Sequence, residues 1–290
     1  MTPDVAKQSP AAVAEEASLN VLGVPTAKRS RRGVQDGSSR LLRALPLISV
    51  VVFLLVWQVL GSNVDPILLA TPTAVVAAFA DLMSNGQLEP AFLISMGDLL
   101  VGYGAAIVVG IAVGILMGRS VTIERILNPY VNFFQATPLI ALVPLVVIWF
   151  GVGFEARVVV TFLLAVWSVI INTASGIKQT PDSLIDVGRV YKFNRRQTVM
   201  TIALPNAVPS IYAGLRIGLG KALIGVIIAQ MEISVTGLGG LVINYGNAFK
   251  TAYLLAGICT ASLVGVVAVS GLELSRKWLF PWTKVDRVNS

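Results

Sequence analysis

Histidine is absent from the sequence, and cysteine occurs once, as Cys259. A disulfide within one chain needs two cysteines, and histidine and cysteine are the usual ligands of zinc, so we expect neither a disulfide nor a metal site. Charged residues make up only 13% of the 290 residues, against about 25% in typical soluble proteins. Hydrophobic residues reach 55% and the mean hydropathy is +0.79, so the composition indicates a protein of the lipid bilayer.

Long apolar runs fill the chain where charges are missing. A transmembrane helix needs about 20 mostly apolar residues, and we predict an all-α fold in which a membrane domain over 41–280 contains six such helices. The uncharged stretches are 44–64, 99–118, 126–154, 158–177 and 251–272, and a sixth, 208–231, is apolar except for Arg216 and Lys221. The run 66–80, which contains Pro72, is too short to span, and we expect a helix lying along the membrane surface.

The two ends of the chain are polar. Residues 1–40 include the basic run KRSRR at 28–32 and lack the pattern of a packed core, which predicts a disordered cytoplasmic tail. A cleaved signal peptide is the weaker interpretation, because the first apolar run starts late and lacks a small-x-small cleavage site. Residues 281–290 are predicted to form a short cytoplasmic C-terminal tail.

The positive charges predict the orientation. With six alternating helices and the N-terminus inside, 18 of the 22 Lys and Arg residues fall in cytoplasmic segments, and the exceptions are Arg157, Arg216, Lys221 and Lys250. The loop 62–92 has no Lys or Arg. Basic residues favour the cytoplasmic side, so both termini are predicted to be cytoplasmic. The net charge of +7 therefore indicates membrane topology rather than nucleic-acid binding.

The most highly charged connection is 178–207, which contains PDSLIDVGRVYKF. Apolar residues recur in it at helical spacing, with Asp182 or Ser183 as the expected helix cap, so we predict a short amphipathic helix over 183–194. One interpretation is a helix on lipid headgroups, and the other is a helix that docks into a cytoplasmic partner. Pro205 and Pro209 then bend the chain into the fifth membrane helix.

These residues resemble the coupling motif, called the EAA loop, of ABC importer permeases. Asp186, Val187 and Gly188 match its first positions, Leu204-Pro205 its end, and Gly214-Leu215-Arg216 its continuation. Further segments, LLATPTAVVAAF (68–79), ATPLIALVPLVVIWFGVGFEAR (136–157) and TGLGGLV (236–242), resemble the nitrate/sulfonate/taurine branch of these permeases. Two positions depart from the pattern, because Lys192 stands where the loop usually has glycine and Gln230 where an acidic residue is common.

The resemblance implies a type I importer permease in a bacterial-type cell membrane. ATP and magnesium would be bound by two partner ATPase subunits, since the sequence has no G-x-x-x-x-G-K-[ST] motif and we expect no cofactor in this chain. A second permease copy and an extracytoplasmic solute-binding protein are the other expected partners, with a heterodimer as an alternative to a homodimer. The expected coupling residues are Ser183, Asp186, Val187, Gly188, Arg189, Val190, Tyr191, Lys192, Phe193 and Pro205.

The substrate class that the resemblance implies is a small anion or polar solute, with an organic sulfonate as the first expectation. A secondary transporter or a channel that works without an ATPase is the alternative function. An intramembrane enzyme is not expected, because no nucleophile and base are paired in the sequence.

Two features inside the membrane point to packing and to the transport path. Small residues recur every fourth position at 102–118 and at 214–222, and we interpret both stripes first as close packing within one subunit. A dimer interface is the alternative, chiefly for 214–222. Prolines interrupt the third helix, and broken helices in lipid line protein or water. The expected path residues are Gln135, Thr137, Pro138, Pro144, Lys221, Gln230 and Glu232.

Overall fold

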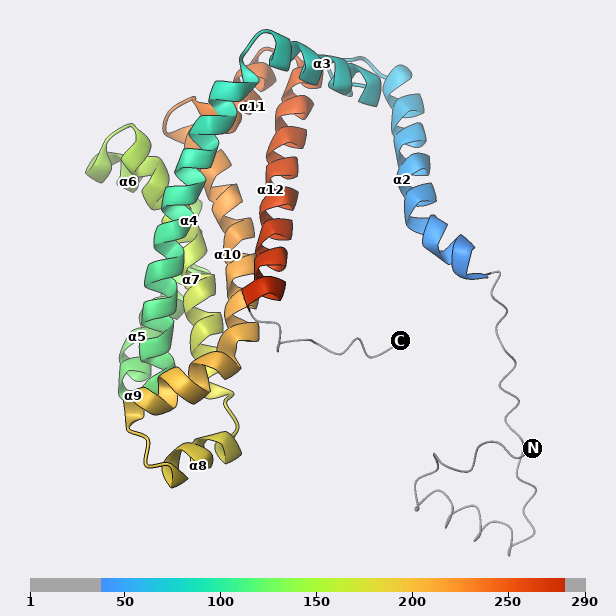
Figure 1. Ribbon diagram of the computed structural model, residues 1–290. Coiled ribbons are helices and arrows are strands. Elements are labelled where there is room, and N and C mark those ends of the chain that lie inside the picture. The colour runs from blue at the N-terminus through green and yellow to red at the C-terminus, as the bar shows by residue number, and fades with distance from the viewer. Residues whose placement is uncertain (1–37, 280–290) are drawn as a thin grey trace, which may run out of the picture. The chain divides into compact units, whose positions relative to one another are not determined.

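The computed structural model describes residues 38–279, with side chains from residue 45 to residue 276, and every element in this part of the chain is helical (Figure 1). The first membrane helix, α2 (Ser38–Ser62), begins three residues before the predicted boundary at residue 41. The rest of the predicted N-terminal tail and all of the predicted C-terminal tail lie outside the described residues.

Five helices of the described part are long and apolar enough to cross a membrane. They are α2, α4 (Leu88–Arg119), α7 (Phe154–Lys178), α10 (Leu204–Glu232) and α12 (Thr251–Leu279). The predicted third span is instead a bent pair, in which α5 (Val121–Ala136) meets η1 (Leu139–Leu142) and α6 (Val143–Phe150) at 93°. The prediction of six spans therefore holds if this bent pair counts as one.

The short apolar segment after α2 is helix α3 (Pro72–Ser84), which is 13 residues long. Thr71 caps its N-terminus by accepting a hydrogen bond from the backbone N–H of Ala74 at 3.3 Å. Pro72 follows the cap, where its missing N–H costs nothing. The helix therefore begins at Pro72 and not at residue 66, as the apolar run alone suggested.

The core of the fold is α7, which packs between α4 and α10. The predicted small-residue stripe of α4 lies against α7, as its members Gly102, Gly110, Gly114 and Gly118 show by their contacts with Thr161, Val169, Thr173 and Ile177. A Cβ atom on Gly114 would lie 2.5 Å from the Cβ of Thr173, so only glycine permits this approach. The predicted packing within one subunit is confirmed.

The second small-residue stripe faces the same helix. A Cβ on Gly214 would lie 2.6 Å from the Cβ of Asn172, and one on Gly218 would lie 3.1 Å from a methyl group of Val169. Ala222, on the next turn of the stripe, is fully buried. Packing within one subunit is therefore confirmed for this stripe as well, and the alternative of a dimer interface does not hold, because α7 of the same chain already occupies the stripe.

The charged connection 178–207 forms three short helical elements before α10: α8 (Asp182–Val190), α9 (Arg195–Thr198) and the π-helical turn η2 (Val199–Ala203). A capping box starts α9, since Asn194 and Gln197 exchange side-chain to backbone hydrogen bonds at 2.8 and 2.9 Å. Pro205 lies in the first turn of α10 and cannot donate an i to i−4 hydrogen bond, which favours the wider π turn before it. The chain changes direction between α9 and α10 (Figure 1).

A final short helix, α11 (Gly237–Asn247), connects α10 to α12. It packs against α12, α10 and α4, at the end of the helices opposite to α8 (Figure 1). The fold therefore has two specialised ends, one formed by α8 and α9 and the other by α3 and α11.

Candidate functional site

The amphipathic helix predicted in the charged connection is α8, which ends at Val190 rather than at residue 194. Its N-cap is Pro181, so the expected cap by Asp182 or Ser183 was wrong. The exposed apolar and aromatic side chains at this end are Leu184, Val187, Val190 and Tyr191. A row of exposed apolar groups on a short helix is typical of a surface that is buried by another molecule.

Gly188 ties α8 to the segment that leads into α10. It is the buried residue of α8, and a Cβ atom placed on it would lie 2.9 Å from Cδ1 of Ile202 in η2. The absence of a side chain thus lets α8 rest directly on η2. Helix α8 therefore contacts the segment that leads into α10.

Lys192 occupies the position where the family pattern has glycine, and it adopts the left-handed conformation with φ of 54°. The N–H of Lys192 donates to the carbonyl of Arg189 at 2.9 Å, and the N–H of Phe193 donates to that of Gly188 at 2.8 Å. These two bonds form a Schellman motif, which ends the helix. The tight turn is therefore made without glycine, and a non-glycine residue there costs about 1–2 kcal/mol.

Charged and polar side chains complete the α8 surface. Asp186 accepts a hydrogen bond from Arg189 at 2.7 Å, and both side chains are largely exposed. Ser183 is exposed as well, and the rings of Tyr191 and Phe193 lie 6.1 Å apart. The expected coupling residues of 183–193 thus form one continuous element, and Pro205 lies in the first turn of α10 beyond it.

The expected path residues of the third span lie at the sharp break between α5 and α6. Thr137 ends α5, and its hydroxyl donates to the carbonyl of Phe133 at 2.7 Å. Gln135, Pro138 and Pro144 are exposed around the same break. The predicted interruption at the two prolines is confirmed, and its geometry is a turn of 93° rather than a kink.

Three further expected path residues lie on α10 in different surroundings. Lys221 is half-buried near the middle of the helix, and within residues 45–276 no ion pair involves it. Glu232, at the end of the helix, is exposed. Gln230 is fully buried among protein groups, which places its side chain inside the helix packing.

Gln230 belongs to a buried polar cluster that joins α4, α7 and α10. Oδ2 of Asp98 accepts hydrogen bonds from Nε of Arg157 and from Nε2 of Gln230, both at 2.8 Å. Arg157 also donates to the hydroxyl of Ser234 at 2.7 Å. Asp98 is fully buried and Arg157 nearly so, and such a pair is tolerated only when both charges are matched.

The cluster extends to the first turn of α11. The amide oxygen of Gln230 accepts hydrogen bonds from Ser95 at 2.9 Å and from the backbone N–H of Gly239 at 3.1 Å. The hydroxyl of Ser95 accepts one from the N–H of Leu238 at 2.9 Å. Two backbone donors of the α11 N-terminus are therefore satisfied by side chains of α4 and α10. The sequence marked Gln230 as a departure from the family pattern and as an expected path residue, but no spacing in the sequence paired it with Asp98 or Ser95.

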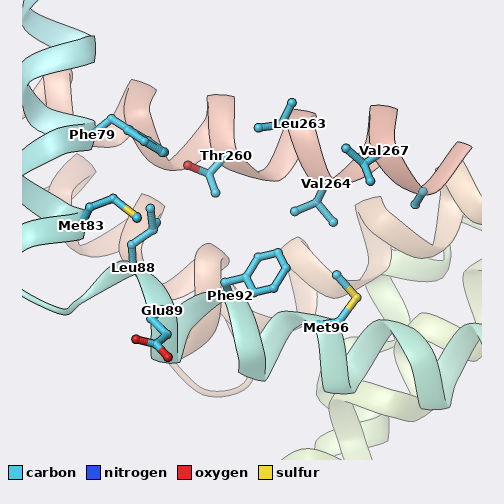
Figure 2. Close-up of a pocket in the computed structure, with 11 residues that line it drawn as sticks. Phe79, Met83, Leu88, Glu89, Phe92, Met96, Thr260, Leu263, Val264 and Val267 are labelled. Atoms are coloured by element: carbon cyan, nitrogen blue, oxygen red, sulfur yellow. The ribbon is translucent and has the colours of Figure 1, made fainter. Parts of the chain in front are cut away.

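A cavity of about 620 Å³ lies between α3, α4 and α12, as Figure 2 shows. Its lining is almost entirely apolar, with Phe92 and Met96 facing Val264 and Val267 and with Glu89 at one edge. It contains none of the expected path residues. An apolar cavity offers no groups to replace the hydration of a small anion, so it is a poor candidate for the transport path.

Comparison with known proteins shows to which family this chain belongs. The model of the family described as "Binding-protein-dependent transport system inner membrane component" matches residues 106–284. The chain belongs to this family. It is a membrane-spanning permease subunit of an ABC importer, and the family description implies an extracytoplasmic binding protein and an ATPase as the other components.

Two relatives of this permease cover most of its length. The "Putative aliphatic sulfonates transport permease protein SsuC" of Bacillus subtilis is 31% identical over 238 residues, which are 81% of this chain and 86% of the relative. The "Taurine transport system permease protein TauC" of Escherichia coli is 29% identical over 245 residues, which are 82% of this chain and 89% of the relative.

A solved structure with the same fold is that of the "MetNI methionine ABC transporter" in an inward-facing conformation. It has a TM-score of 0.52 and 19% identity, and the match covers 64% of this chain and 95% of that chain. The likeness supports the importer-permease fold.

Proposed function

We propose that this permease works as a homodimer above two ATPase subunits and carries a small organic sulfonate or a similar anion that a binding protein delivers. The single observation that supports the coupling is α8, whose exposed apolar residues project at one end while Gly188 rests on Ile202. An ATPase that binds α8 would therefore act directly on η2 and, through it, on α10.

The transmission from α8 to the membrane follows from the packing of α10. Closure of the ATPases on ATP pushes α8, and the π-helical turn η2 and the prolines at 205 and 209 transfer the push to α10. Two rows of close contacts join α10 to α7 and α7 to α4, so these three helices move together. The cavity between the two permease copies then changes the side of the membrane to which it opens.

The anionic substrate is supported by Lys221. A charge at the centre of a membrane helix costs about 2.5–3.5 kcal/mol on insertion scales, so it is retained for a purpose. Lys221 is half-buried near the middle of α10, so a sulfonate that passes this part of the helix would meet a positive charge.

The orientation is supported by the distribution of charge. The end that contains α8 and α9 has a high density of Lys and Arg, whereas the α3 end has Asp65, Asp81 and Glu89 and, between residues 62 and 92, no basic residue. Basic residues favour the cytoplasmic side. The α8 end therefore faces the cytoplasm and the α3 end the outside.

The test is ATP-driven uptake into vesicles that contain the permease with its ATPase. Gly188→Leu should lower uptake at least tenfold while hydrolysis of ATP continues, because a side chain at this position forces α8 away from Ile202. Gln179→Ala, an exposed substitution at the end of α7, is the control and should leave uptake unchanged. Coupled uptake by Gly188→Leu at the normal rate would reject the lever, and gradient-driven uptake without any ATPase would favour a secondary transporter.

A further inference from the structure

The turn between α11 and α12 contains the second left-handed non-glycine residue of the described part of the chain. Phe249 has φ of 55°, and the N–H groups of Phe249 and Lys250 close a Schellman motif on the carbonyls of Gly246 and Tyr245 at 3.0 and 2.9 Å. Glycine is favoured at this position, and a phenylalanine there costs about 1–2 kcal/mol. The Phe249 side chain is also 71% exposed, so its ring gains little from contacts within the chain.

An exposed apolar patch surrounds Phe249. The hydroxyl of Thr251 donates to the carbonyl of Ile67, which holds the loop before α3 against the start of α12. Ile67 and Leu68 in this loop are 53% and 75% exposed. Within this loop the N–H of Ile67 donates to the carboxylate of Asp65 at 2.8 Å. We call Phe249, Ile67 and Leu68 together the outer patch.

Polar and charged side chains form a rim beside the outer patch. The hydroxyl of Tyr253 donates to Asp81 at 2.9 Å, and its ring stacks on that of Tyr245 at 4.9 Å. Nζ of Lys250 lies 5.7 Å from the centre of the Tyr253 ring. Asp65 and Asp81 leave the rim with more negative than positive charge. An apolar centre within a charged rim has the composition of a protein-binding surface.

The outer patch lies at the end of the helices opposite to α8 (Figure 1). Both left-handed non-glycine residues, Lys192 and Phe249, therefore end a short helix beside exposed apolar or aromatic side chains, one at each end of the molecule. In each case the local conformation is costly, and the apolar or aromatic side chains beside it are largely exposed. The favourable energy is then expected from a second molecule.

We propose that the outer patch is the docking surface for the extracytoplasmic solute-binding protein, with Phe249 inserting into an apolar pocket whose edge has basic groups facing Asp65 and Asp81. This inference rests on the proposed importer function. The family description supports the choice of partner, since it names a binding-protein-dependent transport system. The acidic rim argues against insertion into lipid, because carboxylates are excluded from the acyl chains.

The partner is identified first by cross-linking. A photo-reactive phenylalanine analogue replaces Phe249 in the full-length permease in its native cells, and the cross-linked product is identified by mass spectrometry. A solute-binding protein joined at position 249, and absent when the analogue replaces exposed Leu274 instead, supports the proposal. Cross-links to lipid alone, or to another class of protein, would overturn it.

The cross-linked binding protein is then purified, loaded with a sulfonate and titrated onto the permease with its ATPase in nanodiscs. Phe249→Gly should raise the Kd at least tenfold and abolish the stimulation of ATP hydrolysis, while basal hydrolysis stays unchanged. Glycine relieves the left-handed strain, so a fall in affinity does not come from misfolding. Leu274→Ala is the matched control and should change neither quantity.

The two hypotheses fail in different ways. If the wild-type complex shows no ligand-stimulated hydrolysis, the proposed importer function fails. If the wild-type complex is stimulated and Phe249→Gly binds with the same Kd, the importer function stands and the docking surface is rejected.

Discussion

Arg157 and Asp98 form an ion pair 2.8 Å long that is buried between α7 and α4. Asp98 also accepts a hydrogen bond from Gln230 of α10, so one carboxylate joins all three core helices. Through Gln230 the same cluster reaches the first turn of α11. The ends of four helices, on the side of the fold opposite to α8, are therefore connected by hydrogen bonds, in addition to the apolar packing along their length.

Substitution of Asp98 tests how much this cluster contributes to the free energy of unfolding. Asp98→Ala leaves Arg157 charged, buried and without its carboxylate, and breaking a buried pair in this way costs about 3–5 kcal/mol. We expect a free energy of unfolding in detergent that is lower by this amount. Glu273→Gln, which removes the exposed partner of Arg216, is the control and should cost less than about 1 kcal/mol. Equal effects of the two substitutions would contradict the account.

The contact between α4 and α7 is sensitive to a single methyl group. Gly114→Ala places a Cβ 2.5 Å from that of Thr173, and we expect a loss of about 1–3 kcal/mol in the free energy of unfolding. Gly104→Ala on the same helix meets no atom within 4 Å and should be neutral or slightly stabilising. Thermal unfolding of both variants in the same detergent makes the comparison. A stable Gly114→Ala protein would show that the helices separate easily.

Substitution of the left-handed Lys192 at the end of α8 by glycine should stabilise this helix, whereas the substitutions of Asp98 and Gly114 should destabilise the protein. Lys192→Gly removes about 1 kcal/mol of strain, so hydrogen exchange of the α8 amides should slow roughly fivefold. Lys192→Val places a β-branched side chain in the same conformation and should accelerate exchange. Exchange is measured by mass spectrometry on peptides that cover 182–194. Identical exchange in the three proteins would mean that the turn is not formed in solution.

The positive charge of Lys221 is predicted to govern anion transport. Lys221→Gln should lower the rate of sulfonate uptake about tenfold, because the loss of one close charge in a partly buried site is worth at least 1.4 kcal/mol. Lys221→Arg should retain most of the uptake. Uptake of labelled sulfonate into vesicles is compared with stimulated ATP hydrolysis, which should fall less. Unchanged uptake by Lys221→Gln would remove this residue from the path.

The sequence predicted those parts of the structure that depend on local pattern. Apolar runs of about 20 residues located the membrane helices, and the small residues of 102–118 indicated close packing. The coupling helix followed from helical spacing and from a motif. Its end at Val190 was missed because the pattern continues to Phe193, although the left-handed turn at Lys192 stops the helix.

Contacts between distant residues were not predictable in this way. Asp98, Arg157 and Gln230 are separated by 59 residues or more, and no periodicity brings them together. The stripe at 214–222 marked a close approach of helices but did not say which helix approaches. The turn of 93° after Thr137 also depends on the packing of α6 against α7, whereas the prolines predicted only that a break occurs.

The most direct test of the central claim is ATP hydrolysis by the permease reconstituted in lipid with its ATPase, measured with and without a sulfonate-loaded binding protein. The account predicts stable association of the subunits and vanadate-sensitive hydrolysis that rises severalfold when the loaded binding protein is added. A permease that associates with no ATPase, yet takes up solute down an ion gradient, would contradict it.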